Sequence, residues 1–209
     1  MSKSSLETSE SLAIERVKWL ESLGRVQSCR QGDGGARLRR MGALVACVAR
    51  AIGLSEHESD VLRVAAPLHD IGMSYVPDRI IHSPGVLTEA DRDTMRRHTE
   101  VGAAIIGEHR DEFLETARLA ALTHHERWDG GGYPHGLSGK KIPLVGRITA
   151  LCDVFDSMLS PRAYRPAYTP DETRRHIAEI AGLHFDPKLA GHFQTIFPEL
   201  LEIRRADTG

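Results

Sequence analysis

Apolar residues recur at three- and four-residue steps along nearly the whole chain, which is the spacing of one face of an α-helix. No convincing run of alternating β-branched residues predicts a strand. The apolar steps predict helices over residues 6–28, 36–53, 55–71, 88–106, 111–127, 142–160 and 169–181, and a last one from residue 186 onward. We therefore expect an all-α fold, a compact bundle of about seven or eight helices.

Three helix starts carry capping signals. Ser55, Thr88 and Thr169 each stand three residues before an acidic residue, and this spacing is typical of a capping box or a related N-cap. Between two of these helices, residues 75–87 contain two prolines and a glycine, which predicts an ordered loop.

The first helix is set apart from the rest by a glycine-rich break at residues 31–35. We interpret residues 1–32 as an N-terminal amphipathic helix with its linker, and residues 33–209 as one globular domain. The helix either packs on its own domain or mediates contact with another chain. That contact would be a homodimer or the docking of a signalling protein.

Composition narrows the function classes. The formal net charge of −2 gives no global basic field for DNA or RNA. No apolar run is long enough for a membrane span, and the N-terminus lacks the apolar region of a signal peptide. The three cysteines are far apart and lie in helical patterns, as expected of reduced core residues in a cytoplasmic protein.

The candidate chemistry centres on the adjacent pair His124-His125, which precedes a run of three glycines. A helix C-terminus also favours His and Arg, so the pair alone supports a structural interpretation equally well. Four further residues change the balance because they fall at helix ends or on faces otherwise turned to the core: His69, Asp70, His98 and Asp153. Asp153 interrupts the most apolar helix, where an unpaired charge is costly. Imidazoles and carboxylates without thiolates predict a divalent metal site for Fe, Mn, Zn or Ni.

The order of these groups resembles one known family. The matching segments are His69-Asp70-Ile71-Gly72, Met95-x-x-His98-Thr99, His124-His125-Glu126-x-x-Asp129-Gly130-x-Gly132-Tyr133-Pro134, and Ile142-Pro143 through Asp153-Val154-Phe155-Asp156. Over about residues 33–193 the chain is similar to the HD-GYP branch of the HD phosphohydrolase superfamily. The resemblance implies a helical domain with a bi- or trinuclear centre, usually of iron or manganese. It also implies hydrolysis of cyclic di-GMP, a bacterial second messenger, to the linear dinucleotide or to GMP.

The resemblance also implies residue roles. Asp70 would bridge two metal ions and serve catalysis directly. The remaining ligands would divide between one ion, held by His98, His124 and His125, and another, held by His69 and Asp153. Gly132, Tyr133 and Pro134 would shape the substrate mouth, while Arg162 and Arg165 would contact substrate phosphate.

Two departures from the family pattern bear on activity. The family's first histidine ligand is Arg37 here, and a glutamate ligand of trinuclear members is Asp33. Arginine has no free lone pair for a metal. We expect its guanidinium to lie near His69, Asp70 and Asp153 and to replace one ion. The family's phosphate-binding lysine is Met73. Two functions therefore stay open: a weakened cyclic di-GMP phosphodiesterase, or a catalytically inactive domain that binds a nucleotide or a partner protein.

Two other residues near these segments have predicted roles of their own. Asp156 is expected to hydrogen-bond near the site rather than bind metal. Trp128 is expected to anchor the glycine loop, and stacking on a guanine base is the alternative.

Overall fold

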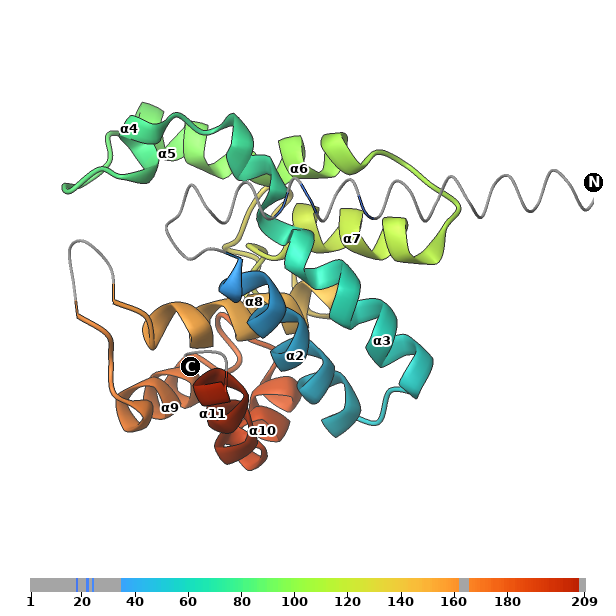
Figure 1. Ribbon diagram of the computed structural model, residues 1–209. Coiled ribbons are helices and arrows are strands. Elements are labelled where there is room, and N and C mark those ends of the chain that lie inside the picture. Colours follow the sequence, from blue (N-terminus) through green and yellow to red (C-terminus); the bar gives the residue numbers. More distant parts are fainter. Residues whose placement is uncertain (1–17, 19–21, 23, 25–34, 162–165, 207–209) are drawn as a thin grey trace, which may run out of the picture.

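The computed structural model describes residues 18, 22, 24, 35–161 and 166–206, and over these ranges it confirms an all-α fold without strands. Figure 1 shows the arrangement. The elements are α2 (Ala36–Ala51), α3 (Glu56–Ala65), the 3₁₀ helix η1 (Ala66–Tyr75), α4 (Asp78–Ile81), α5 (Glu89–Arg96), α6 (His98–Ile106), α7 (Glu112–Thr123), the short 3₁₀ helix η2 (Gly139–Lys141), α8 (Leu144–Met158), α9 (Pro170–Glu179), α10 (Pro187–Thr195) and α11 (Phe197–Ala206). The predicted helix over residues 6–28 lies outside the described residues, apart from three positions.

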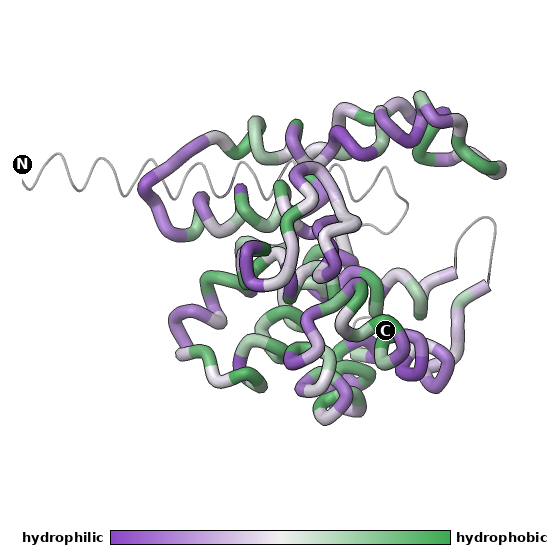
Figure 2. The backbone as a smooth tube through the Cα atoms, turned by 180° about the vertical axis from the view of Figure 1, so that it is seen from behind, coloured by the Kyte–Doolittle hydropathy of each residue, from purple (hydrophilic) through white to green (hydrophobic). Residues whose placement is uncertain are grey.

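Helix α2 is the centre of the bundle. It packs against α3 and η1 on one side and against α8, α10 and α11 on the other (Figure 1). Its apolar face enters the largest core cluster, whose fully buried members include Met41, Leu44, Val45, Val48, Ile148, Leu151, Phe155 and Phe193. Apolar and polar residues alternate along most helices (Figure 2), because each helix turns one face to this shared core.

The predicted caps are present. Ser55 and Thr169 each accept a hydrogen bond from the amide of the glutamate three residues on, and that glutamate binds back to the cap amide. Thr88 accepts from the amide of Asp91. These side chains satisfy amides that the first turn of a helix leaves without partners.

The helix predicted over residues 55–71 changes character at Pro67. Proline has no amide hydrogen for the carbonyl of Arg63, so the α-helical ladder ends and η1 continues as a ten-residue 3₁₀ helix. A Cβ added to Gly42 would lie 2.5 Å from that Arg63 carbonyl oxygen. Glycine at this position therefore lets α2 cross close to the end of α3.

Three other boundaries differ from the prediction. The helix expected over residues 88–106 is divided into α5 and α6 at Arg97, and the last helix is divided into α10 and α11 at Ile196. The loop expected over residues 75–87 contains the single-turn helix α4, which begins after Pro77. In each case the apolar spacing continues through the break, so periodicity alone does not reveal it.

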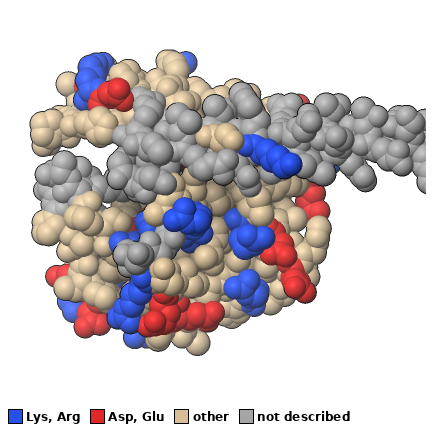
Figure 3. Space-filling model, in the orientation of Figure 1, with Lys and Arg blue, Asp and Glu red and all other residues tan. Residues whose placement is uncertain are grey.

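The surface and the buried cysteines agree with the composition. Basic and acidic side chains are interspersed on the face shown in Figure 3. Cys47 and Cys152 are buried and reduced, while Cys29 lies outside the described residues. Among the described residues, no helix is both long and apolar enough to cross a membrane.

Candidate metal centre

Two glycines let η1 and α6 approach backbone to backbone. A Cβ on Gly72 would lie 2.0 Å from the carbonyl oxygen of His98 and 2.5 Å from the amide nitrogen of Gly102. Real Cβ atoms do not make such contacts, so only glycine fits. This crossing holds His69 and Asp70, on η1, beside His98 at the start of α6.

A second close crossing sets α8 against the end of α7. A Cβ on Gly146 would lie 2.1 Å from the hydroxyl oxygen of Thr123, the last residue of α7. His124 and His125 follow Thr123 directly, and Asp153 lies two turns further along α8. The two crossings thus bring ligand-type side chains from four elements to one place.

Four of these groups form a compact cluster. One ligand atom from each of Asp70, His98, His124 and His125 lies within 4.8 Å of all the others. The side chains of His98 and His124 are buried, and those of Asp70 and His125 are partly buried. Buried imidazoles around one carboxylate form a donor set that suits a divalent transition metal.

Backbone contacts orient the imidazoles of the cluster. The Nδ1 atoms of His69, His98 and His124 lie 2.9, 2.6 and 3.0 Å from the carbonyl oxygens of Ala66, Met95 and Ala120. Nδ1–H therefore donates to the backbone, and Nε2 carries the free lone pair.

The resulting geometry favours a cation between the rings. His98 Nε2 and His124 Nε2 lie only 3.2 Å apart. Two lone pairs that face each other at this distance repel unless a proton or a metal cation lies between or beside them. Burial and the neighbouring His124 lower the pKa of His98 to about 4, so a proton is disfavoured there near neutral pH. A metal ion therefore fits this side of the cluster.

The two oxygens of Asp70 face different partners. Oδ1 lies 3.6 Å from both His98 Nε2 and His124 Nε2. Oδ2 lies 3.3 Å from His69 Nε2 and 3.6 Å from Arg37 Nη2. Burial opposes ionisation of Asp70, but the charges of His69 and Arg37 help to hold its pKa well below the usual range. Asp70 therefore joins the histidine cluster to a second, differently built side of the site.

Arg37 occupies that second side, as the sequence predicts. Its guanidinium pairs closely with Asp153 and lies near Asp70 Oδ2, while His69 Nε2 is 3.8 Å from Asp153 Oδ1. Burial disfavours a charge on Arg37, but the carboxylates of Asp153 and Asp70 outweigh this and raise its pKa. The same two carboxylates raise the pKa of His69 against the effect of its burial. The guanidinium thus neutralises the two carboxylates that a second metal ion would need as ligands.

The loop after the histidines is fixed by a residue that sequence reasoning missed. Glu126 is buried, and its carboxylate accepts hydrogen bonds from the amides of His135 and Leu137 at 2.8 and 2.9 Å. A single glutamate in a polar segment gives no signal of such burial. Gly132 is also required, since its Cβ would lie 2.4 Å from the amide nitrogen of Arg127.

This loop places Tyr133 over the cluster. The Tyr133 ring stacks on the His125 ring with centroids 4.8 Å apart and planes inclined by 24°. The peptide bond between Tyr133 and Pro134 is cis. The tyrosine thus covers one side of His125 and borders any ligand that reaches the metal side of the cluster.

The other predicted residues separate into two groups. Asp156 hydrogen-bonds as expected, to Arg40 at 2.5 and 2.9 Å and to Arg204. The amide of Trp128 donates to the His184 carbonyl at 3.0 Å and so ties its loop to the segment before α10. The predicted phosphate contacts Arg162 and Arg165, and the alternative ligand Asp33, lie outside the described residues.

Met73 lies in an apolar cluster with Val76 and Ile80, against which Met95 packs. Its side chain is buried, so the methionine is part of the packing between η1 and the α4–α5 segment. A lysine at this position would have to extend out of that cluster to reach a phosphate.

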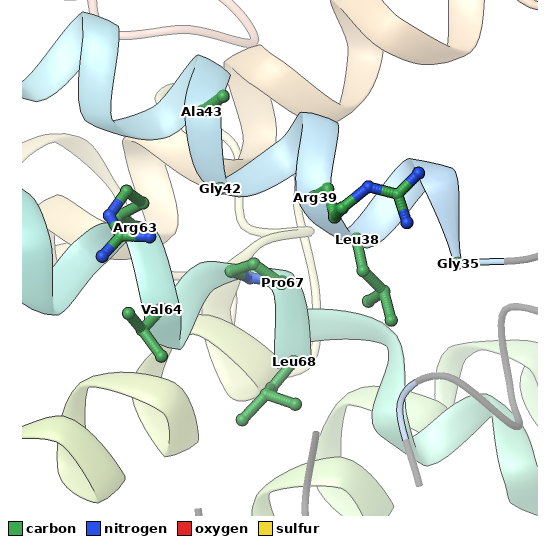
Figure 4. A pocket seen from close by; sticks show the side chains of 9 residues that line it. All are labelled: Gly35, Leu38, Arg39, Gly42, Ala43, Arg63, Val64, Pro67 and Leu68. Carbon is green, nitrogen blue, oxygen red and sulfur yellow. The ribbon is translucent and has the colours of Figure 1, made fainter. Parts of the chain in front are cut away.

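A separate cavity of about 470 Å³ lies between α2, α3 and η1 (Figure 4). Its lining is Gly35, Leu38, Arg39, Gly42, Ala43, Arg63, Val64, Pro67 and Leu68. Gly24 approaches its edge, because a Cβ there would lie 3.4 and 3.6 Å from side-chain carbons of Leu68 and Leu38. The cavity contains none of the four clustered ligand residues, so it is not the candidate metal centre.

Known proteins match most of this chain in sequence. Residues 22–189 match the family described as HD domain. A cyclic di-GMP phosphodiesterase response regulator of Xanthomonas campestris is 42% identical over 169 residues, which are 81% of this chain and 45% of that protein. A cyclic di-GMP phosphodiesterase of Thermotoga maritima is 36% identical, over 90% of this chain and 51% of that protein.

A third relative carries a different substrate in its name. A 3′3′-cGAMP-specific phosphodiesterase of Vibrio cholerae is 37% identical, over 88% of this chain and 35% of that protein. The chain thus spans about half, or less, of the length of these curated relatives.

Solved structures share the fold. A cyclic GMP-AMP-specific phosphodiesterase of Vibrio cholerae superposes with a TM-score of 0.62 at 21% identity, over 89% of this chain and 50% of that one. An HD-GYP-type protein of Bdellovibrio bacteriovorus gives 0.61 at 17% identity, over 79% and 54%.

Proposed function

Because the chain belongs to the HD domain family, in its HD-GYP group, we propose that it is a metal-dependent phosphodiesterase acting on cyclic di-GMP. The products would be the linear dinucleotide or GMP. The names of the relatives support a cyclic dinucleotide as the substrate class, and two of the three name cyclic di-GMP. The reduced thiols of Cys47 and Cys152 support a cytoplasmic location.

The proposal rests on the convergence of four ligand-type side chains. One ligand atom from each of Asp70, His98, His124 and His125 lies within 4.8 Å of the others, and the Nε2 atoms of His98 and His124 are 3.2 Å apart. We assign these four residues as the ligands of one divalent cation, iron or manganese by preference, with zinc or nickel as alternatives. Such an ion would supply Lewis-acid polarisation of a phosphoryl oxygen and of water.

The chain's own residues supply binding and orientation. Backbone carbonyls fix the tautomers of His98 and His124, and that of the neighbouring His69, so these imidazoles are preorganised. Asp70 links the two sides of the site and is the residue we assign to catalysis. Gly132, Tyr133 and Pro134 form the rim on the His125 side, and Arg162 and Arg165 remain candidates for phosphate contact.

The position of Arg37 supports a reduced phosphodiesterase activity. His69 and Asp153, the remaining predicted ligands, face a guanidinium instead of a second ion. A site of this kind would hold one ion, and one ion cannot clamp both the attacking and the leaving oxygen of a phosphodiester. Turnover would then be slow compared with that of a two-metal site.

The same contact favours a second candidate function. If one ion is insufficient, the domain binds a cyclic dinucleotide, or a signalling protein, without cleaving it. Tight dinucleotide binding without product would identify this second function.

The experiment combines metal analysis with turnover. We expect protein purified without chelator to retain about one ion per chain and to hydrolyse cyclic di-GMP slowly with added Mn²⁺ or Fe²⁺. Replacement of His124 and His125 together by Ala should abolish metal retention and lower the melting temperature. The reason is that a ligand at about 100 times its Kd stabilises the native state by about 2.7 kcal/mol. Unchanged metal content in the double variant would refute the assignment.

A further inference from the structure

Two arginines stand side by side between α5 and α6, and each lies over a different tyrosine. Arg96 Cζ is 5.6 Å from the centroid of the Tyr133 ring, and Arg97 Cζ is 5.3 Å from the centroid of the Tyr75 ring. Both distances are in the range of cation–π contacts, which favour one position of a guanidinium without occupying its N–H donors. The two arginines therefore make the same kind of contact, but each with a different tyrosine.

Of these two arginine–tyrosine pairs, the pair of Arg96 and Tyr133 is the one that contacts the candidate metal centre. Tyr133 stacks on His125, and His125 is one of the four clustered ligand residues. Arg96 is thus connected to the cluster through two ring contacts, its own with Tyr133 and that of Tyr133 with His125. Its side chain is 57% exposed, and its ion pair with Asp93 is long, at 3.6 Å, and open to solvent. The guanidinium retains donors for an anionic ligand at the mouth of the site.

Arg96 also adjoins the apolar cluster that contains Met73, because the preceding residue, Met95, packs against that cluster. Met73 is the position where the resembled family carries a phosphate-binding lysine, and here it is buried and uncharged. Arg96 presents a positive charge from the segment that packs against Met73.

We propose that Arg96, held on Tyr133, binds the phosphate of the cyclic dinucleotide that is not being cleaved. This inference rests on the proposed function. A cyclic dinucleotide carries two phosphodiester groups on opposite sides of one ring. The group that is cleaved would lie at the cluster, to which Arg96 is connected through the rings of Tyr133 and His125. A guanidinium next to Tyr133, at the mouth of the site, can form paired charge-assisted hydrogen bonds with the second anion.

The experiment compares Arg96→Gln with Arg97→Gln, which removes the same charge from the adjacent residue. The main readout is the Kd of a phosphorothioate analogue of cyclic di-GMP, which resists hydrolysis, on the metal-loaded protein. We expect Arg96→Gln to raise this Kd about tenfold and Arg97→Gln to leave it within about twofold. Arg96→Lys should fall between Arg96→Gln and the wild type, because it keeps the charge and loses the fork.

Two further readouts separate a binding role from a structural one. Metal content should be the same in all variants. KM for cyclic di-GMP should rise in Arg96→Gln, and by more than in Arg97→Gln.

Three results would overturn the inference. Wild-type affinity in Arg96→Gln would exclude the contact, and an equal loss in Arg97→Gln would show only a general effect of charge. If the wild-type protein binds no cyclic dinucleotide at all, the proposed function fails and this inference falls with it. In the first two cases the proposed function survives.

Discussion

We propose that Arg37 limits the site to one ion. Its guanidinium pairs with Asp153 and lies 3.6 Å from Asp70, in a region from which solvent is largely excluded. Removal of one partner from a buried ion pair costs about 3–5 kcal/mol, because the remaining charge is left without compensation. A substitution at this position therefore has to supply a new way to neutralise Asp70 and Asp153.

Arg37→His meets that requirement if a metal ion enters. The imidazole would join His69, Asp70 and Asp153 as a ligand set, so metal content should rise by about one ion per chain and hydrolysis of cyclic di-GMP should increase. Arg39→His is the matched control, since it adds a histidine to the exposed side of the same helix. Metal analysis of both variants gives the answer. An Arg37→His protein with no extra metal would show that the second side cannot be rebuilt by one ligand.

His184 provides a pH-dependent contribution to stability outside the cluster. Burial, and then the nearby Arg127 charge, lower the pKa of His184 to about 4, against about 6.5 for an unperturbed histidine. The folded state therefore binds this proton less readily than the unfolded state. The stability is fully present above about pH 6.5 and is lost as the pH falls from there toward 4.

The size of this loss is about 1–3 kcal/mol, after a discount for the partial exposure of the ring. His184→Gln should flatten the fall in the free energy of unfolding between pH 7 and pH 4, measured by urea titration. An identical slope in the variant would place the pH dependence elsewhere.

At the scale of helices, apolar periodicity and cap residues predicted where the helices lie, but not where they are interrupted. The starts of α3, α5 and α9 follow from their cap residues. The change to 3₁₀ geometry at Pro67 follows from the missing amide hydrogen of proline, a local cause that apolar spacing does not show. The division at Arg97 lies within a continuous apolar pattern. Helix starts are therefore encoded in their cap residues, whereas apolar spacing does not mark the interruptions.

Gly146, at the crossing of α7 and α8, can be compared with Gly191, a helical glycine whose added Cβ would meet open space. Gly146→Ala would place a Cβ 2.1 Å from the Thr123 hydroxyl oxygen, whereas Gly191, in α10, has nothing within 4 Å of its added Cβ. We expect Gly146→Ala to cost about 1–3 kcal/mol through overpacking and to weaken metal retention. Gly191→Ala should stabilise the protein by about 0.5–1 kcal/mol. Thermal unfolding of both variants tests this, and equal melting temperatures would contradict the close crossing.

At the scale of the whole molecule, the fold assembles one site from residues far apart in sequence. The resemblance pointed to the ligand-type residues and to Arg37, and the structure brings Asp70, His98, His124 and His125 together with Arg37 beside them. The two-sided surroundings of Asp70 were also expected from the resemblance. The sequence did not reveal that Glu126 is buried and holds its loop, because this depends on where the loop lies after folding. The N-terminal helix and its role in self-association stay predictions.

Anomalous X-ray scattering from crystals of protein purified without chelator counts the metal ions and locates them at the same time. We expect one ion, bound by Asp70, His98, His124 and His125, with the Arg37 guanidinium still paired to Asp153. Two ions, with Arg37 displaced from Asp153, would contradict this expectation, as would the absence of any ion from the four-residue cluster.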